Sequence, residues 1–476
     1  MQQKAFSFIE RRMMSVSQVR TAYLIGAAAG FHLLLTLTIY LIGRFALLPD
    51  VFDANGMGMY FATDGYAFRA ESISMADILT REGASAWLAT PAPFHVCAYS
   101  LSYALFSPVF GFNVLSAEPL NLLCYLATLV LIFKLGEEVF DRRVGLLAAF
   151  LAALWPSLLL HSTQVLRDPL FQLATLTLVL TCATWLTRDY SWRAALALGV
   201  MGGVIAALLW VIRINMWGIV PAIVLLGAAW FTVRQINERR IIVGNLLGVI
   251  VLLILTALVP KLVPRPVYYM TQPNGAPLVE NKDLPAAAQG PPALRYEPRA
   301  EQPSSVWQRL GARVGDARAG FKRQYPQAGS NIDTDVQLSN MSDVIGYLPR
   351  AMAIGLFAPF PDMWLASGDR VGLYGRLLSG LETLAIYCLE LLALVCLWPL
   401  RRRLSAWLLL SIVILCVTAL GLVVTNVAAL YRMRYTFWML LIILGAQGLI
   451  KIAAKVLLTD GYDQGLTAAE PEKKSK

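Results

Sequence analysis

The chain has 476 residues, of which 57% are hydrophobic and only 15% are charged. Its mean hydropathy is +0.60, whereas a soluble domain is about half apolar and about a quarter charged. This composition excludes a soluble globular protein and predicts an all-α protein that crosses the membrane many times. The net charge of +10 does not require a nucleic-acid partner, because the basic residues gather in short loops, where they orient membrane proteins.

Ten stretches are apolar and long enough to span a bilayer, which takes about 20 residues each. In chain order they are 21–48, 117–136, 144–163, 169–187, 193–213, 216–233, 241–260, 376–399, 404–425 and 433–452. No small-residue cleavage site follows the first stretch, so we expect an anchor and not a removed signal peptide.

The distribution of lysine and arginine predicts the orientation. With both termini in the cytoplasm, half of the 40 basic residues lie in inner segments, as the positive-inside rule requires. Two further apolar stretches, 92–112 and 348–366, contain prolines that break straight helices. If either one alone crossed the membrane, every later basic loop would change side. We therefore expect both at the outer face as interfacial or re-entrant helices.

The expected organisation has five parts. These are a cytoplasmic N-terminus (1–20), a transmembrane module (21–260) with an outer loop (49–116), an outer segment with interfacial helices (261–375), the last transmembrane helices (376–452) and a cytoplasmic tail (453–476).

The large outer segment combines two kinds of sequence. Residues 272–303 are polar and rich in proline, which predicts a flexible loop. Residues 307–325 place apolar side chains at helical spacing beside five basic residues. This pattern suits a membrane surface or an anionic substrate, although an ordinary solvated helix also accounts for it.

The first outer loop contains the first candidate for chemistry, Asp64, which is followed by Gly65, Tyr66 and Arg69. An aspartate at this position could accept a proton from a hydroxyl nucleophile, and Gly65 would let the backbone pass close to a substrate. The alternative is a plain turn, because Asp-Gly is a common turn dipeptide.

Arg167 and Asp168 follow His161 in the outer connection between the third and fourth spans. Asp168 precedes Pro169 and could cap the next helix, since proline is common in a first helical turn. In the functional alternative, Asp168 and Arg167 face a cavity below the first outer loop, because ionisable groups at this depth are costly without a role.

Four more arginines lie at the predicted outer face. Arg213 could snorkel to the headgroups or bind a lipid phosphate, and Arg350 is a weaker candidate of the same kind. Arg432 and Arg434, next to Tyr431, precede the last span. Paired guanidinium groups suit a phosphate, whereas anchoring of tyrosine and arginine in the membrane interface is the competing interpretation.

The sequence contains no P-loop, HExxH motif, dinucleotide fingerprint or CxxC pair, so we expect no nucleotide cofactor. The six cysteines all lie in apolar stretches and are interpreted as small buried hydrophobic residues. Whether a divalent metal joins the site stays open at this stage.

This order of features resembles the GT-C superfamily of membrane glycosyltransferases, in particular the dolichyl-phosphate-mannose protein mannosyltransferases and the lipid A aminoarabinose transferases. The resemblance covers roughly residues 20–235 and, more loosely, 340–450. Asp64 and Asp168 match the family's acidic residues of the first and second outer loops, the first of which is implicated in catalysis. The chain departs from the mannosyltransferases in one respect, because Gly65 follows Asp64 where a second acidic residue is usual.

The resemblance implies a multi-pass glycosyltransferase of the bacterial inner membrane that acts in cell-envelope polysaccharide biosynthesis. It would move a hexose or pentose, with inversion, from a polyprenyl-phosphate donor to a lipid, glycan or protein acceptor at the periplasmic face. Asp64 would be the base, and Asp168 would orient the acceptor or an arginine. The expected donor-binding residues are Arg213, Arg432, Arg434, Arg167, Arg350 and Tyr431, and the expected supporting residues are Tyr66, Arg69 and His161.

Two alternatives belong to other classes. A polysaccharide polymerase or O-antigen ligase would also use outer arginines, but against a glycan linked to a lipid pyrophosphate. A transporter of lipid-linked sugars would show internal repeats and ionisable residues near the bilayer midplane. The sequence shows no clear repeat, and its unexplained charges gather at one face.

Overall fold

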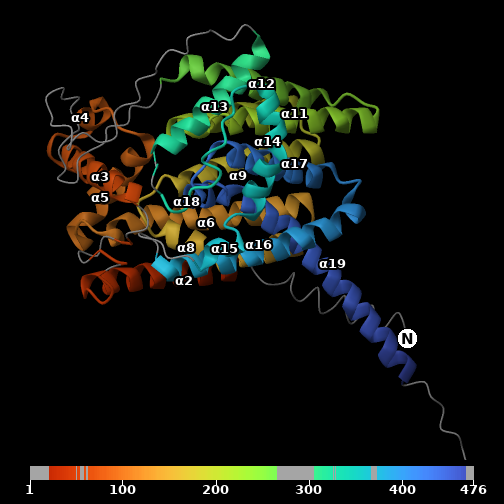
Figure 1. Ribbon diagram of the computed structural model, residues 1–476, viewed down its shortest axis with the longest axis horizontal. Coiled ribbons are helices and arrows are strands. Elements are labelled where there is room, and N and C mark those ends of the chain that lie inside the picture. The colour runs from red at the N-terminus through yellow and green to blue at the C-terminus, as the bar shows by residue number, and fades with distance from the viewer. Residues whose placement is uncertain are drawn as a thin grey trace, which may run out of the picture.

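The computed structural model describes residues 21–49, 51–53, 58–59, 63–264, 305–324, 326, 328–365 and 372–467. This part of the chain consists of helices, loops and two isolated β-bridges. Long helices lie side by side in a bundle, and the short helices of residues 63–110 lie together at one end of it (Figure 1). The predicted N-terminal segment 1–20, the predicted flexible loop 272–303 and the end of the tail lie outside the described residues.

Nine helices of the described part are long and apolar enough to cross a membrane, and they coincide with nine of the ten predicted spans. Their bounds are α2 (Thr21–Arg44), α6 (Val114–Val139), α9 (Asp168–Thr187), α10 (Trp192–Ile212), α11 (Ile219–Glu238), α12 (Val243–Leu262), α16 (Gly372–Leu400), α17 (Leu404–Val423) and α19 (Tyr435–Thr467). The last helix therefore continues past residue 453, where the sequence predicts the start of a separate tail.

The tenth predicted span, 144–163, is a bent pair of helices. It consists of α7 (Arg142–Ala153) and α8 (Pro156–Ser162), which meet at an angle of 65°. Pro156 lies in the first turn of α8, where proline starts a helix well but cannot continue the preceding one. Helix α8 therefore runs in a different direction from α7, and the connection after it leads to Asp168.

The shorter helices occupy the stretches that are predicted to lie at the outer face. They are α3 (Thr63–Arg81), α4 (Ala84–Ala89), α5 (Phe94–Phe110), α13 (Val306–Gln324), α14 (Met341–Phe357), α15 (Pro361–Trp364) and α18 (Val427–Met433). Helix α5 covers the ambiguous stretch 92–112, and α14 with α15 covers most of 348–366. Neither stretch is among the candidate spans of the described part.

Close backbone contact joins α10 to α12. A Cβ atom on Gly199 would lie 2.4 Å from the carbonyl oxygen of Gly248, and one on Gly248 would lie 2.4 Å from that of Ala195. Small residues allow membrane helices to approach in this way, where van der Waals packing replaces the hydrophobic effect.

The centre of the bundle lies around α9 and α19. Two thirds of the most apolar window of each helix is buried, more than in any other described span. Asp168 is the first residue of α9, and Arg432 and Arg434 lie just before α19. The most buried helices of the bundle thus begin at the residues for which the sequence predicts chemistry.

Candidate active site

One guanidinium group joins the two predicted catalytic carboxylates. Arg432 donates a hydrogen bond from Nη2 to Asp64 Oδ2, and its Nε lies 3.5 Å from Asp168 Oδ2. The side chains of Asp64 and Arg432 are 27% and 19% exposed, whereas that of Asp168 is 3% exposed. Helix α3, the start of α9 and helix α18 therefore converge on one cluster of charges, in which Asp64 and Arg432 are partly exposed.

A second arginine holds the other oxygen of Asp168. Arg213 Nη1 donates to Asp168 Oδ1 at 2.5 Å, and both side chains are buried. Removing either partner would leave a buried charge uncompensated, which is strongly destabilising. Arg213 therefore does not snorkel. Asp168 likewise makes no side-chain cap of α9, so its carboxylate serves arginines and not the helix end.

Asp64 is held in its ionised form. Burial raises the pKa of Asp64, but the ion pair with Arg432 and the positive charge of Arg167 outweigh burial and hold the pKa below its ordinary value. Arg167 lies over the ring of Phe68, with its guanidinium carbon 5.5 Å from the ring centroid. An ionised, partly exposed carboxylate is the form that a general base requires.

The predicted supporting residues Tyr66 and Arg69 lie on α3, and His161 lies on α8. The guanidinium carbon of Arg69 lies 5.0 Å from the ring centroid of Tyr66, and its Nη1 lies 3.8 Å from Asp53 Oδ2. On α8, the Nδ1 atom of His161 lies 2.7 Å from the carbonyl oxygen of Ser157. His161 also packs edge-on against the ring of Tyr435.

The structure places Arg434 away from Arg432, which corrects the prediction that both hold one phosphate. The side chain of Arg434 is fully buried, and it donates to the carbonyl oxygens of Gly355, at 2.7 Å, and Ala358. Its guanidinium carbon lies 4.1 Å from the ring centroid of Trp438. Arg434 thus satisfies the carbonyl groups at the end of α14, which lack partners within that helix.

Two other predicted donor-binding residues also have internal partners. Arg350 Nε lies 2.9 Å from Asp333 Oδ2, so its partner is neither predicted catalytic carboxylate. The hydroxyl of Tyr431 donates to Glu382, and the side chain is buried. Tyr431 therefore neither anchors the chain in the headgroup layer nor presents its hydroxyl to a donor.

Glu382 and His95 are not among the residues predicted from the sequence. Glu382 lies within the predicted span 376–399. Its position could have indicated a role, because ionisable groups inside membrane segments usually have one. His95 is fully buried, with its ring 4.3 Å from that of Phe68. Burial lowers the pKa of His95 to about 3, so its imidazole is neutral. No sequence pattern indicates its position behind Phe68.

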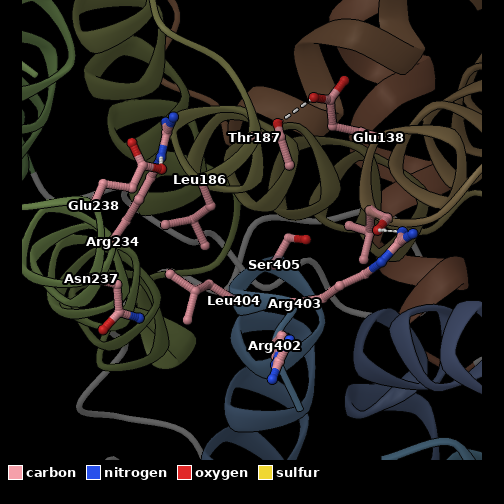
Figure 2. Close-up of a pocket in the computed structure, with 11 residues that line it drawn as sticks. Glu138, Leu186, Thr187, Arg234, Asn237, Glu238, Arg402, Arg403, Leu404 and Ser405 are labelled. Atoms are coloured by element: carbon pink, nitrogen blue, oxygen red, sulfur yellow. Dashed lines mark hydrogen bonds and ion pairs between the residues drawn. The ribbon is translucent and has the colours of Figure 1, made fainter. Parts of the chain in front are cut away.

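A cavity of about 390 Å³ lies at the opposite ends of the same helices, where α6, α9 and α11 end and α17 begins (Figure 2). Two of its arginines already serve the protein backbone. Arg403 donates to the carbonyl oxygens of Val139 and Phe140, and Arg234 donates to those of Trp185 and Arg188. The end of the bundle that carries Asp64, Asp168 and Arg432 is therefore the stronger candidate site.

The charge of the site favours an anion. Arg167, Arg213 and Arg432 surround two aspartates, which leaves one excess positive charge. In the described part of the chain, no three histidine, cysteine or acidic residues are grouped as metal ligands. The position between the two carboxylates, which a bridging cation would take, is filled by the guanidinium group of Arg432.

Residues 95–263 match the family model of the dolichyl-phosphate-mannose-protein mannosyltransferases. The predicted resemblance is confirmed for this segment. It contains Asp168, Arg167 and Arg213, whereas Asp64 and Arg432 lie outside it.

Two solved structures of an oligosaccharyltransferase from Archaeoglobus fulgidus are similar to the chain. One is AglB in complex with an inhibitory peptide and a dolichol-phosphate, with 12% identity, and the other is the apo form, with 13% identity. The TM-score is 0.43 for both, and the matches cover 94% and 92% of this chain. The chain spans about half the length of both structures, 52% in each case. No curated protein sequence matches the chain significantly.

Proposed function

We propose that the chain is an integral-membrane glycosyltransferase of the GT-C type. It would move a sugar from a polyprenyl-phosphate donor to a hydroxyl group of a lipid, glycan or protein acceptor. One observation carries the proposal, namely that Arg432 joins the carboxylates of Asp64 and Asp168 at one end of the bundle. The mannosyltransferase match over residues 95–263 supports the same reaction class.

Asp64 has the properties of the general base. Its carboxylate would take the proton of the acceptor hydroxyl, and the acceptor oxygen would attack the anomeric carbon. The new carbon–oxygen bond forms as the bond between that carbon and the phosphate oxygen breaks, and polyprenyl phosphate leaves with the bonding electrons. Attack from the face opposite the phosphate inverts the anomeric configuration.

The arginines have the properties needed by the leaving group. Negative charge develops on the phosphate as the bond breaks, and fixed cations in a poorly hydrated site stabilise such charge strongly. Arg432, which is partly exposed, would contact the phosphate. Arg213 is buried against Asp168 and would supply positive charge without direct contact, while Asp168 would keep both guanidinium groups in place.

The proposed location follows from the distribution of charge. The basic loops predict that both termini are cytoplasmic, which would place Asp64 and Arg432 at the periplasmic face of a bacterial inner membrane. A donor presented there must be carried across the membrane by its lipid, which agrees with a polyprenyl carrier.

The test is transfer by the purified protein in lipid nanodiscs. Polyprenyl-phosphate sugars and lipid-pyrophosphate-linked glycans are supplied separately, and released carrier lipid is measured by mass spectrometry. We expect release from a monophosphate donor, and its loss in Asp64→Asn. Asp77→Asn is the matched control, because Asp77 lies on the same helix and its side chain is half exposed. Consumption of only pyrophosphate-linked glycans would favour a polymerase or ligase, and full activity of Asp64→Asn would remove Asp64 as the base.

A further inference from the structure

We propose that Glu382 is a positioning residue that ties together the two chain segments on either side of the candidate site. Its carboxylate is buried in α16 and accepts three hydrogen bonds. The Ser157 N–H donates to Oε1 and the Ser157 hydroxyl donates to Oε2, both at 2.5 Å, and the Tyr431 hydroxyl also donates to Oε2.

The two donors belong to different halves of the site. Ser157 lies in the first turn of α8, where the helix itself offers no acceptor for the backbone N–H. Helix α8 leads through a short connection that ends at Arg167 to Asp168, the first residue of α9. Tyr431 directly precedes Arg432 on α18. The carboxylate of Glu382 therefore joins the segment that positions Asp168 to the segment that positions Arg432.

Neither segment can hold its geometry alone. Helices α8 and α18 have seven residues each, and helices this short are unstable without tertiary contacts. The ring of Tyr431 lies 5.3 Å from that of Tyr435 and 5.0 Å from that of Trp438. These aromatic contacts pack around α18, but packing is not directional. The hydrogen bond to Glu382, in contrast, fixes where the hydroxyl of Tyr431 can lie.

This fixed position matters because Arg432 must reach two carboxylates at once. A small displacement of α18 relative to α8 would lengthen the contact between Arg432 and Asp168 while the contact between Arg432 and Asp64 survived. Misplacement of about 1 Å from a distant change can lower turnover by about a hundredfold. The effect on turnover rests on the proposed glycosyltransferase function, whereas the tie between the two segments does not.

The experiment compares Glu382→Gln and Tyr431→Phe with Glu390→Gln. Glu390 is a second acidic residue of α16, and its Oε1 has no hydrogen-bond partner in the described part of the chain. We expect the first two variants to lower kcat by about tenfold to a hundredfold with a nearly unchanged KM for the donor. We expect Glu390→Gln to leave both constants unchanged. In an Arg432→Lys background, the loss of kcat caused by Glu382→Gln should be much smaller, because the guanidinium group that Glu382 is proposed to position is already absent.

A second measurement does not depend on activity. Hydrogen exchange of the full-length protein should be faster over residues 157–162 and 427–433 in Glu382→Gln and Tyr431→Phe, but not in Glu390→Gln. If exchange changes as expected and the wild-type protein turns over no donor, the proposed function fails while the tie stands.

Two results would overturn the inference. One is unchanged exchange and kcat in both variants, and the other is an equal loss of kcat in the wild-type and Arg432→Lys backgrounds. If Glu382→Gln does not fold, Tyr431→Phe decides, because it removes one hydroxyl group and keeps the ring packing.

Discussion

At the scale of residues, the chain uses neighbouring arginines for opposite purposes. Arg432 is partly exposed and joins two carboxylates, whereas Arg434 is fully buried and donates to main-chain carbonyls. Both functions need the planar guanidinium fork, which a lysine ammonium does not reproduce. The two residues differ in what is lost when the fork is removed.

Lysine substitutions should separate these functions. Arg432→Lys should lower transfer efficiency about tenfold to a hundredfold, since one charge-assisted contact is worth about 1.5–3 kcal/mol, and should leave the melting temperature almost unchanged. Arg434→Lys should lower the melting temperature and leave the activity of the folded fraction nearly intact. Thermal melts and steady-state kinetics on the same preparations measure both quantities. The reverse pattern would return the phosphate contact to Arg434.

The pH profile reports the ion pair of Asp64. Arg432 and Arg167 hold the pKa of Asp64 below 3.8 although burial raises it. The activity that depends on ionised Asp64 should therefore persist to below the ordinary pKa of an aspartate and be lost only as the pH falls through the depressed value. The stability contributed by the pair should follow the same course. In Arg432→Gln, less positive charge opposes the effect of burial on the pKa of Asp64, so the acid limb of kcat/KM should move to higher pH. An unmoved limb would exclude Asp64 as the titrating base.

Asp64, Asp168, Arg213 and Arg432 are predicted site residues because charges at the ends of apolar spans are unusual. The structure brings these four together, and their role stays a prediction. The sequence pattern does not distinguish Arg432 from Arg434, and it does not indicate the buried hydroxyl contact of Tyr431. Tyr431 and Arg432 lie on the short helix α18 and Arg434 follows its last residue. Which of these side chains faces the site depends on packing against α14 and α16.

At the scale of elements, the break between α7 and α8 shows what hydropathy cannot resolve. The stretch 144–163 reads as one continuous span, and Pro156 alone indicates that it bends. Ser157 of this stretch donates to Glu382, which lies more than two hundred positions away in the chain. No local sequence pattern therefore connects the two residues. The other nine spans were predictable because length and hydrophobicity alone determine whether a helix can cross a membrane.

The contact between α10 and α12 leads to a stability prediction. Gly248→Ala should lower the melting temperature, because its Cβ atom would lie 2.4 Å from the carbonyl oxygen of Ala195 and overpacking costs about 1–3 kcal/mol. Gly30→Ala is the matched control in another membrane helix, since nothing lies within 4 Å of its added Cβ atom. Thermal melts in one detergent compare them. Equal melting temperatures would show that the two helices can move apart at little cost.

At the scale of the whole molecule, the two ends of the bundle differ in chemistry. One end carries Asp64, Asp168 and Arg432, and the other carries the basic loops and the cavity of Figure 2. The same helices connect both ends, so the orientation of the bundle decides which compartment supplies the acceptor.

Cysteine labelling tests this orientation in a background without native cysteines. Asp77→Cys, at the site end, should react with an impermeant thiol reagent in spheroplasts. Arg402→Cys, on the exposed surface beside the opposite cavity, should react only after the membrane is permeabilised. The opposite labelling pattern would place the candidate site in the cytoplasm and contradict a periplasmic reaction.

The contact between Arg432 and Asp64 has a kinetic consequence. The arginine that lowers the basicity of Asp64 is also the group proposed to contact the donor phosphate. In the empty protein, Asp64 is therefore a weak base. When a phosphate draws the guanidinium group toward itself, the carboxylate regains affinity for a proton. Under the proposed function, the two substrates would add in a compulsory order, with the donor first, and an acceptor that arrives alone would meet a protein that is not yet able to deprotonate it.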